Sequence, residues 1–178
     1  MHIGNKLHPD STEQAVHYFT AIPEHFRGKD LKKLERHLNF ISALQKSGVK
    51  VSKQGFTQDP GNTYAKVNGV EELSWVEKGT DVALTSKLFE EAFKNSFDHA
   101  VIMSNDADYL PALESFKRMY PNKSVSFAIT PANGRGNRKL RRVPNSYEVK
   151  PEDYANCQLV DSIRISNTKT IVRPDYWR

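Results

Sequence analysis

The sequence predicts one α/β domain built on a mostly parallel β-sheet. Apolar, β-branched segments alternate with amphipathic segments in the order strand, helix, strand, helix, strand, which is typical of parallel sheets whose crossovers are helices. The chain has 178 residues, enough for one domain with a hydrophobic core and too short for two. We therefore expect an N-terminal segment at 1–14, a domain at 15–150, and a C-terminal extension at 151–178 that packs on the domain.

The first half of the chain supplies two strands and the helix between them. Residues 15–22, AVHYFTAI, combine the β-branched and aromatic residues of a strand, which Pro23 closes. Asp30 is placed to cap a helix that Gly48 ends. The apolar residues of this helix recur at helical spacing, namely Leu31, Leu34, Leu38, Ile41 and Leu44. A second strand is expected at 49–56, followed by turns at 57–69.

The second half of the chain adds two helices and two strands. Residues 82–95 predict an amphipathic helix with three inward residues, Leu84, Leu88 and Phe89. Residues 100–103, AVIM, are continuously apolar, which is typical of a strand that helices cover on both faces. A third helix carries Leu110, Leu113, Phe116 and Tyr120 on its inward face, with Pro111 in the first turn, where proline is tolerated. Residues 124–130, SVSFAIT, form the next predicted strand.

Composition limits the classes of function. The formal net charge is +5 and the isoelectric point is near 9.2, which favours anionic partners such as nucleic acid. No apolar run approaches the roughly 20 residues that cross a bilayer, and residues 1–14 contain no apolar core of the signal-peptide type, so we expect a cytoplasmic protein with no membrane partner. The single Cys157 excludes an internal disulfide and a multi-cysteine metal site. The histidines lack zinc-site spacing, and no glycine-rich nucleotide loop is present.

Three aspartates are expected to meet at one edge of the sheet. Asp106 and Asp108 follow the strand at 100–103, and open parallel sheets bind ligands beyond the carboxyl ends of their strands. Asp81, after the acidic Glu77, opens the preceding helix, whose N-terminus falls on the same edge. Such a cluster would repel itself. A divalent cation relieves the repulsion, and oxygen ligands favour Mg²⁺ or Mn²⁺.

Simpler interpretations of the same aspartates stay open. Asp108 has the position of an N-cap for the following helix, and Asp81 favours its helix dipole in any case. Asp106 is harder to explain as a turn residue, because Asn105 beside it would satisfy a turn. An Asp-x-Asp after an apolar strand also binds Mn²⁺ in sugar-nucleotide transferases. Those folds need a larger chain, so we disfavour that class.

A basic segment follows the strand at 124–130. Residues 133–145, NGRGNRKLRRVPN, place five positive charges within eight residues, namely Arg135, Arg138, Lys139, Arg141 and Arg142. The segment follows the carboxyl end of a parallel strand, so we expect it near the aspartates, holding a phosphate backbone through salt-sensitive contacts. The alternative is a solvated loop or helix face. A solvated helix face is our interpretation of a second basic set, Lys32, Lys33, Arg36 and Lys46.

Two motifs resemble a known family. Residues 77–82 read Glu-Lys-Gly-Thr-Asp-Val, and residues 104–109 read Ser-Asn-Asp-Ala-Asp-Tyr. The motifs and their spacing resemble the NYN domain, in the LabA-like branch of the PIN-like nuclease superfamily. HYFTAI, ALQKSGVKV and, near the C-terminus, YANCQLVDSI with IVRPDYW extend the resemblance over residues 16–177.

The resemblance implies a fold, an activity and a set of site residues. The fold would be a three-layer α/β/α, Rossmannoid sandwich, and the activity metal-dependent hydrolysis of RNA, with single-stranded RNA the favoured partner. Asp81, Asp106 and Asp108 would be the catalytic residues and would hold Mg²⁺ or Mn²⁺. Glu77, Ser104 and Asn105 would support the pocket, Ser104 or Asn105 by binding a phosphate oxygen or orienting a metal-bound water. Tyr109 is expected in the core rather than as a stacking platform.

One family feature has no counterpart in the sequence. The first strand of the family ends in an aspartate, commonly within Asp-Gly-x-Asn, and only fourteen residues precede the strand at 15–22. A start codon placed too late, a true fragment and a degenerate member all explain this, and we interpret the chain as a shortened version of a longer protein. The alternative function is a catalytically impaired relative that binds RNA or a protein through the basic segment. Completion of the sheet by a homodimer also stays open.

Overall fold

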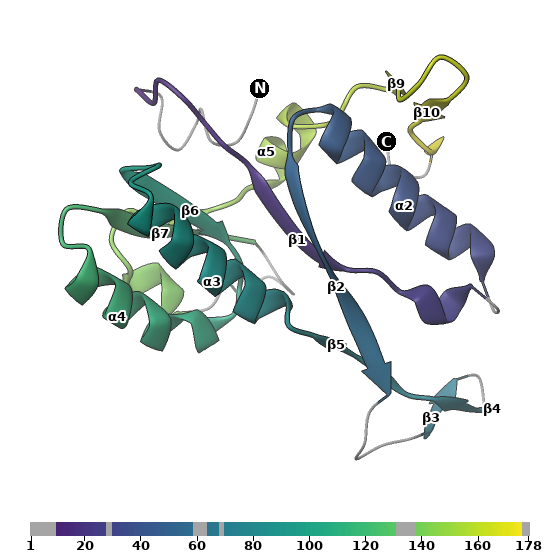
Figure 1. Cartoon of the computed structure of the whole chain (residues 1–178), viewed down its shortest axis with the longest axis horizontal. Coiled ribbons are helices and arrows are strands. Elements are labelled where there is room, and N and C mark those ends of the chain that lie inside the picture. Colours follow the sequence, from purple (N-terminus) through teal and green to yellow (C-terminus); the bar gives the residue numbers. More distant parts are fainter. Residues whose placement is uncertain (1–9, 28–29, 59–63, 68–69, 131–137, 176–178) are drawn as a thin grey trace. The chain divides into compact units, whose positions relative to one another are not determined.

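The structure is a computed structural model that describes residues 10–27, 30–58, 64–67, 70–130 and 138–175. The chain has an α/β fold with mixed sheets, in which several strands run parallel. It divides into two compact units (Figure 1). We call Ala15–Ala83 with Val160–Arg178 the β1 unit, and Met1–Gln14 with Leu84–Leu159 the β6 unit. No helix in the described ranges has the length and apolar character needed to cross a membrane.

The β1 unit contains a three-stranded sheet in the order β1-β2-β5. The first strand, β1 (His17–Ala21), runs parallel to β2 (Lys50–Gln58), with His17 opposite Lys50. The third, β5 (Trp75–Lys78), is antiparallel to β2 and places Glu77 opposite Phe56. A short helix, η1 (Glu24–Phe26), follows β1. The parallel pair and its helical crossover confirm the strand–helix–strand order predicted for this half of the chain.

The crossover helix, α2 (Leu31–Lys46), begins and ends where the sequence predicts. The Asp30 carboxylate accepts a hydrogen bond from the backbone N–H of Lys33 at 2.9 Å, so Asp30 is the N-cap. Beyond the helix, Gly48 has a φ of +89°, which glycine adopts without strain. Within the predicted apolar stripe, Leu34 and Ile41 are buried, whereas Leu31 in the first turn is 56% exposed and does not belong to the core.

The segment predicted to form turns at 57–69 contains strands instead. The strand β2 continues to Gln58, and β3 (Tyr64–Val67) pairs antiparallel with β4 (Val70–Leu73). The prediction was wrong because it extended the strong turn preference of residues 60–62 to the whole of 57–69. The aromatic and β-branched residues at 64–67 and 70–73 have the strand preference that the pairing uses. A second hairpin, β9 (Ser162–Arg164) with β10 (Thr170–Val172), lies near the C-terminus.

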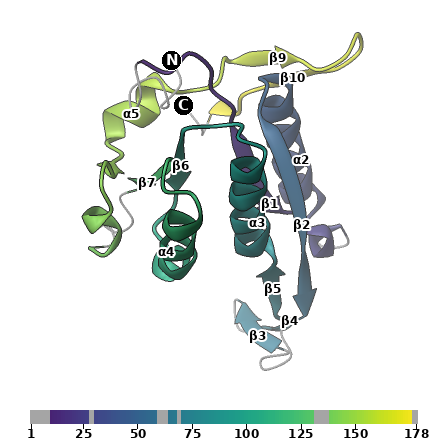
Figure 2. The same ribbon diagram turned by 60° about the vertical axis from the view of Figure 1, so that its left-hand side comes forward.

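The β6 unit contains the second three-stranded sheet, which is entirely parallel. Its order is β6 (His99–Met103), β7 (Ser124–Ile129) and β8 (Tyr147–Glu148). The helices α3 (Thr80–Phe93) and α4 (Leu110–Met119) lie side by side (Figure 2). They pack together through the rings of Phe89 and Phe116, which meet edge to face with centroids 5.5 Å apart. A short helix, η3 (Leu140–Arg142), and α5 (Pro151–Asn156) complete the unit. The core residues Phe116, Phe127 and Leu140 are fully buried.

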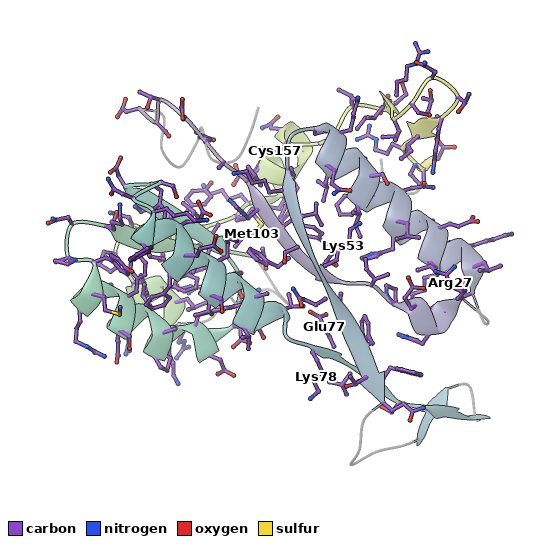
Figure 3. The ribbon with its side chains drawn as sticks, viewed as in Figure 1. Arg27, Lys53, Glu77, Lys78, Met103 and Cys157 are labelled. Carbon is purple, nitrogen blue, oxygen red and sulfur yellow. The ribbon has the colours of Figure 1, made fainter. Side chains whose placement is uncertain are left out.

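The strand β6 is less buried than its apolar sequence predicts. Ile102 packs into the core of the unit, whereas Val101 is 36% exposed. Met103, which is labelled in Figure 3, is 49% exposed. Successive side chains of a strand point to opposite faces, so Ile102 takes the face that meets the helices and the other two take the opposite face. The expectation of burial on both faces is therefore wrong for this strand.

Candidate functional site

The predicted aspartate pair lies in a tight turn directly after β6. The turn continues into a short helix, η2 (Ala107–Tyr109). The Asp106 carboxylate oxygen Oδ1 accepts a hydrogen bond from the backbone N–H of Asp108 at 2.9 Å, and the N–H of Asp106 donates to Ser104 Oγ at 3.0 Å. Both carboxylates are exposed to solvent. The sequence thus presents two acidic groups on a turn whose own backbone holds Asp106 in place.

The capping role falls to Asp106, which corrects the alternative that assigned it to Asp108. Asp106 is the N-cap of η2, whereas Asp108 lies inside that helix. The following α4 has Tyr109 at its N-cap position and no side-chain cap. Because η2 precedes α4, the helical region begins before Asp108, and the backbone N–H of Asp108 needs an acceptor. An aspartate side chain readily accepts from the amide two residues further along the chain, so Asp106 fills this role.

Asn105 ties the ends of two strands together. Its side-chain Nδ2 donates to the backbone carbonyl of Thr130 and lies near Thr130 Oγ1, both at 2.7 Å. Thr130 directly follows β7, which is parallel to β6. The amide therefore fixes the start of the aspartate turn against the neighbouring strand. Thr130 had no role in the sequence predictions, and a lone threonine at a strand end gives no signal that would reveal one.

Replacing Asn105 with Ala is expected to lower the free energy of unfolding by about 0.5–1.5 kcal/mol, the net contribution of a typical hydrogen bond. Urea titration followed by far-UV circular dichroism measures this. Asn122→Ala, at an exposed position before β7, is the matched control. Equal midpoints for the two variants would contradict the bridging role.

Tyr109 belongs to the core, as predicted. It closes η2 and is 8% exposed, among residues that include Leu113 and Val143. The turn thus has a buried anchor at one end and the Asn105 bridge at the other.

The motif at 77–82 belongs to the other unit, where it forms a strand end and a helix start. Glu77 is an exposed residue of β5 (Figure 3), and Asp81 is an exposed residue in the first turn of α3. Gly79 between them has a φ of +84°, a left-handed conformation that explains the glycine in the motif. Because Asp81 lies in the β1 unit and the Asp106–Asp108 turn in the β6 unit, the meeting of the three aspartates stays a prediction.

The aspartate turn has the donor atoms that a hard divalent cation requires. Across the described ranges, no three His, Cys, Asp or Glu side chains are grouped so that they could hold a metal ion. Asp106 and Asp108 nevertheless offer exposed carboxylate oxygens, and Mg²⁺ is commonly held by one or two carboxylates together with water and substrate phosphate. The pair therefore fits Mg²⁺ or Mn²⁺ in donor type, although it does not complete a coordination shell.

The basic segment is anchored in the β6 unit by apolar residues. Leu140 in η3 is fully buried and Val143 is 8% exposed, and these hold the backbone while the cations between and before them face solvent. Exposed cations in the described part of the segment are Arg138, Lys139, Arg141 and Arg142. Arg141 forms an ion pair with Glu148 of β8. Arg135 lies outside the described residues.

The paired aspartates just beyond a parallel strand place the chain among α/β proteins with an acidic site at the edge of a sheet. Comparison with known proteins identifies its family. The family model described as NYN domain matches residues 14–148, more than half of the chain. The chain therefore belongs to the NYN domain family, which is part of the PIN-like nuclease superfamily, broadly ribonucleases. No curated protein and no solved structure matches the chain.

Proposed function

We propose that the chain hydrolyses RNA phosphodiester bonds with Mg²⁺ or Mn²⁺ held by Asp106 and Asp108, joined by Asp81. The observation that carries the proposal is the pair of exposed carboxylates on a braced turn after β6, in a chain of the NYN domain family. The proposal includes the LabA-like branch, the three-layer arrangement and a preference for single-stranded RNA. Glu77 and Asp81, both in the motif at 77–82, would then contribute two further carboxylates to the site.

The residues of the turn would act by holding the two carboxylates in place. A bound divalent cation lowers the pKa of a water molecule and offsets charge on the phosphate. Asp106 already accepts the Asp108 amide, so its side chain loses little further freedom when it binds a ligand. Ser104 and Asn105 contact the turn and Thr130, which favours positioning roles over contact with phosphate. Preorganisation of this kind is what makes electrostatic groups effective in a site.

The basic segment would supply contacts to the RNA backbone. In the part of it that the structure describes, Arg138 and Arg142 have no carboxylate partner, while Arg141 already contacts Glu148. Arg138 and Arg142, with Lys139 and Arg135, would attract phosphates in a manner that weakens as salt increases. Such contacts carry no sequence information, so this segment would contribute affinity rather than base specificity.

A second candidate function is a binding module without cleavage. In the described residues β1 pairs only with β2, and β6 only with β7, so each of the two sheets has an edge where a further parallel strand would fit. An open edge of this kind can pair with a strand of another chain, including a second copy of this one. The chain would then bind RNA or a protein through the basic segment, alone or as a homodimer.

Cleavage of unstructured single-stranded RNA tests the proposal. We expect the end-labelled RNA to be cut in the presence of Mg²⁺ or Mn²⁺ and to stay intact in EDTA. Binding of the same RNA is measured in parallel by fluorescence anisotropy at increasing salt. Intact RNA in every metal, with binding that persists and weakens with salt, would overturn the enzyme proposal and favour the binding module.

A further inference from the structure

A pocket in the β1 unit combines aromatic with cationic side chains and shares no residue with the aspartate turn. Its volume is about 390 Å³, within the range of small-molecule sites. Residues from β1, from the loop after it and from α2 form its walls, namely Tyr18, Pro23, Lys33, Arg36, His37 and Phe40. The last four follow the i, i+3, i+4, i+7 spacing of one helix face on α2. The pocket is therefore built by one face of α2 against the end of β1.

The apolar part of the pocket presents aromatic rings in a fixed arrangement. Tyr18 and Phe40 meet edge to face with ring centroids 6.0 Å apart, and both are half-buried. Pro23 is buried beside them. A planar aromatic ligand gains stacking contact from such rings, and this contact is indifferent to the identity of a nucleobase. The two rings would therefore bind any of the nucleobases by stacking and would not distinguish between them.

The polar part of the pocket is cationic. Lys33 and Arg36 are exposed, and the described ranges provide neither with a carboxylate partner. The Lys33 ammonium lies 4.2 Å from the ring centroid of Phe26. His37 Nε2 lies 3.3 Å from Thr20 Oγ1, a hydrogen-bond contact that orients the imidazole. The pocket therefore offers positive charge to an anion and, from its wall residues, no carboxylate that would oppose one.

Two acidic residues close to the pocket in sequence, Glu24 and Asp30, form their hydrogen bonds with other groups. The Asp30 carboxylate accepts the backbone N–H of Lys33 as the helix cap. The Glu24 carboxylate accepts hydrogen bonds from the Arg27 guanidinium at 2.6 and 3.0 Å. The exposure of Lys33 and Arg36 agrees with the expected solvated helix face. These two cations also border an aromatic pocket.

We propose that this pocket binds one nucleotide, with the base against Tyr18 and Phe40 and the phosphate against Lys33 and Arg36. His37 would donate a further hydrogen bond to the phosphate. The nucleotide could belong to an RNA strand, in which case the inference rests on the proposed function, or it could be a free mononucleotide of the same chemistry. In an RNA strand, the pocket would be a second point of attachment besides the basic segment.

Binding measured in EDTA tests the pocket separately from cleavage. The probe is a fluorescein-labelled oligouridylate followed by anisotropy, with unlabelled uridine 5′-monophosphate and inorganic phosphate as competitors. Lys33→Gln with Arg36→Gln is expected to weaken binding by about tenfold, because each lost phosphate contact lowers the salt-dependent affinity. Phe40→Leu is expected to weaken it severalfold while keeping the site apolar, and circular dichroism checks the fold of each variant.

Matched variants separate the pocket from a general effect of charge. Lys32 lies on α2 next to Lys33, is exposed and does not line the pocket. Lys32→Gln with Lys46→Gln, at the far end of α2, therefore removes the same charge from the same helix. We expect this control to change affinity less than twofold. Equal losses in the control and the pocket pair, or an unchanged affinity in Phe40→Leu, would overturn the proposal.

The competitors identify the source of the nucleotide. Competition by uridine monophosphate but not by phosphate supports a site for a free nucleotide, whereas competition by unlabelled oligouridylate alone supports a site for an RNA strand. Competition by phosphate as strong as by the mononucleotide would overturn a role for the base. Since no step requires a divalent cation, a chain that fails to cut RNA can still pass this test, and an active nuclease can fail it.

Discussion

Replacing Asp106 and Asp108 together with Asn is expected to lower divalent-dependent RNA cleavage at least about a hundredfold, since removing one preorganised electrostatic group from an active site typically has an effect of that size. The fold should persist. Asn caps helices about as well as Asp, and its side-chain oxygen can still accept the amide at position 108, as Asp106 does at 2.9 Å. Initial cleavage rates in saturating Mg²⁺ measure the effect, and circular dichroism confirms folding.

A control with the same change of charge makes the result specific. Asp98 precedes β6 at the end opposite the turn, and Glu114 lies on α4, and both are exposed. Asp98→Asn with Glu114→Gln also removes two negative charges. We expect this variant to cleave at the wild-type rate. Equal rates for the Asp106–Asp108 variant and the wild type would show that any cleavage takes place elsewhere.

Replacing Phe116 with Ala is expected to lower the free energy of unfolding by about 3–5 kcal/mol, the usual cost of removing a large aromatic side chain from a core. Phe116 has 0% exposure. Its ring lies edge to face with Phe89 and within 5.1 Å of the Tyr120 ring centroid, and it stacks with Phe97 at 6.3 Å. It thus joins α3, α4 and the loop before β6, and no single neighbour can fill the space that its loss would leave.

Urea titration followed by far-UV circular dichroism measures this change. Tryptophan fluorescence is less suitable, because Trp75 lies in the β1 unit and Phe116 in the β6 unit. Met119→Ala is the control, since Met119 is on the same helix but 61% exposed, and exposed substitutions usually change stability by about 0.5 kcal/mol or less. A loss in Phe116→Ala no larger than in this control would mean that Phe116 is not a core residue in solution.

The elements with strong local signals were predictable from the sequence. For α2, an N-cap at Asp30, an apolar period and a terminal Gly48 all indicated one helix. Asp30 and Gly48 have the expected roles, and Leu34 and Ile41 of the apolar period are buried. A strand was likewise predicted at 124–130, and β7 (Ser124–Ile129) forms there with Val125 to Ile129 buried. In these segments local preference and tertiary packing agree, which is why a single sequence is sufficient.

The features that escaped prediction depend on contacts between distant segments or on shifts of one residue. The β3–β4 hairpin pairs short segments whose strand preference is weaker than the turn preference beside them. The capping residue is Asp106 rather than the predicted Asp108, because the short helix η2 precedes α4. The Asn105–Thr130 bridge joins residues 25 positions apart, and no periodicity marks such a contact.

The hydrogen bond between Asp106 and the Asp108 amide makes abundance and activity separable traits at position 106. In a library of all substitutions there, Asn, Ser and Thr keep an oxygen that can accept this amide, whereas Ala and larger apolar residues do not. Cellular abundance should therefore rank substitutions by their ability to accept a hydrogen bond. Selection for cleavage should rank them by negative charge, so that Asn is tolerated in the first screen and eliminated in the second.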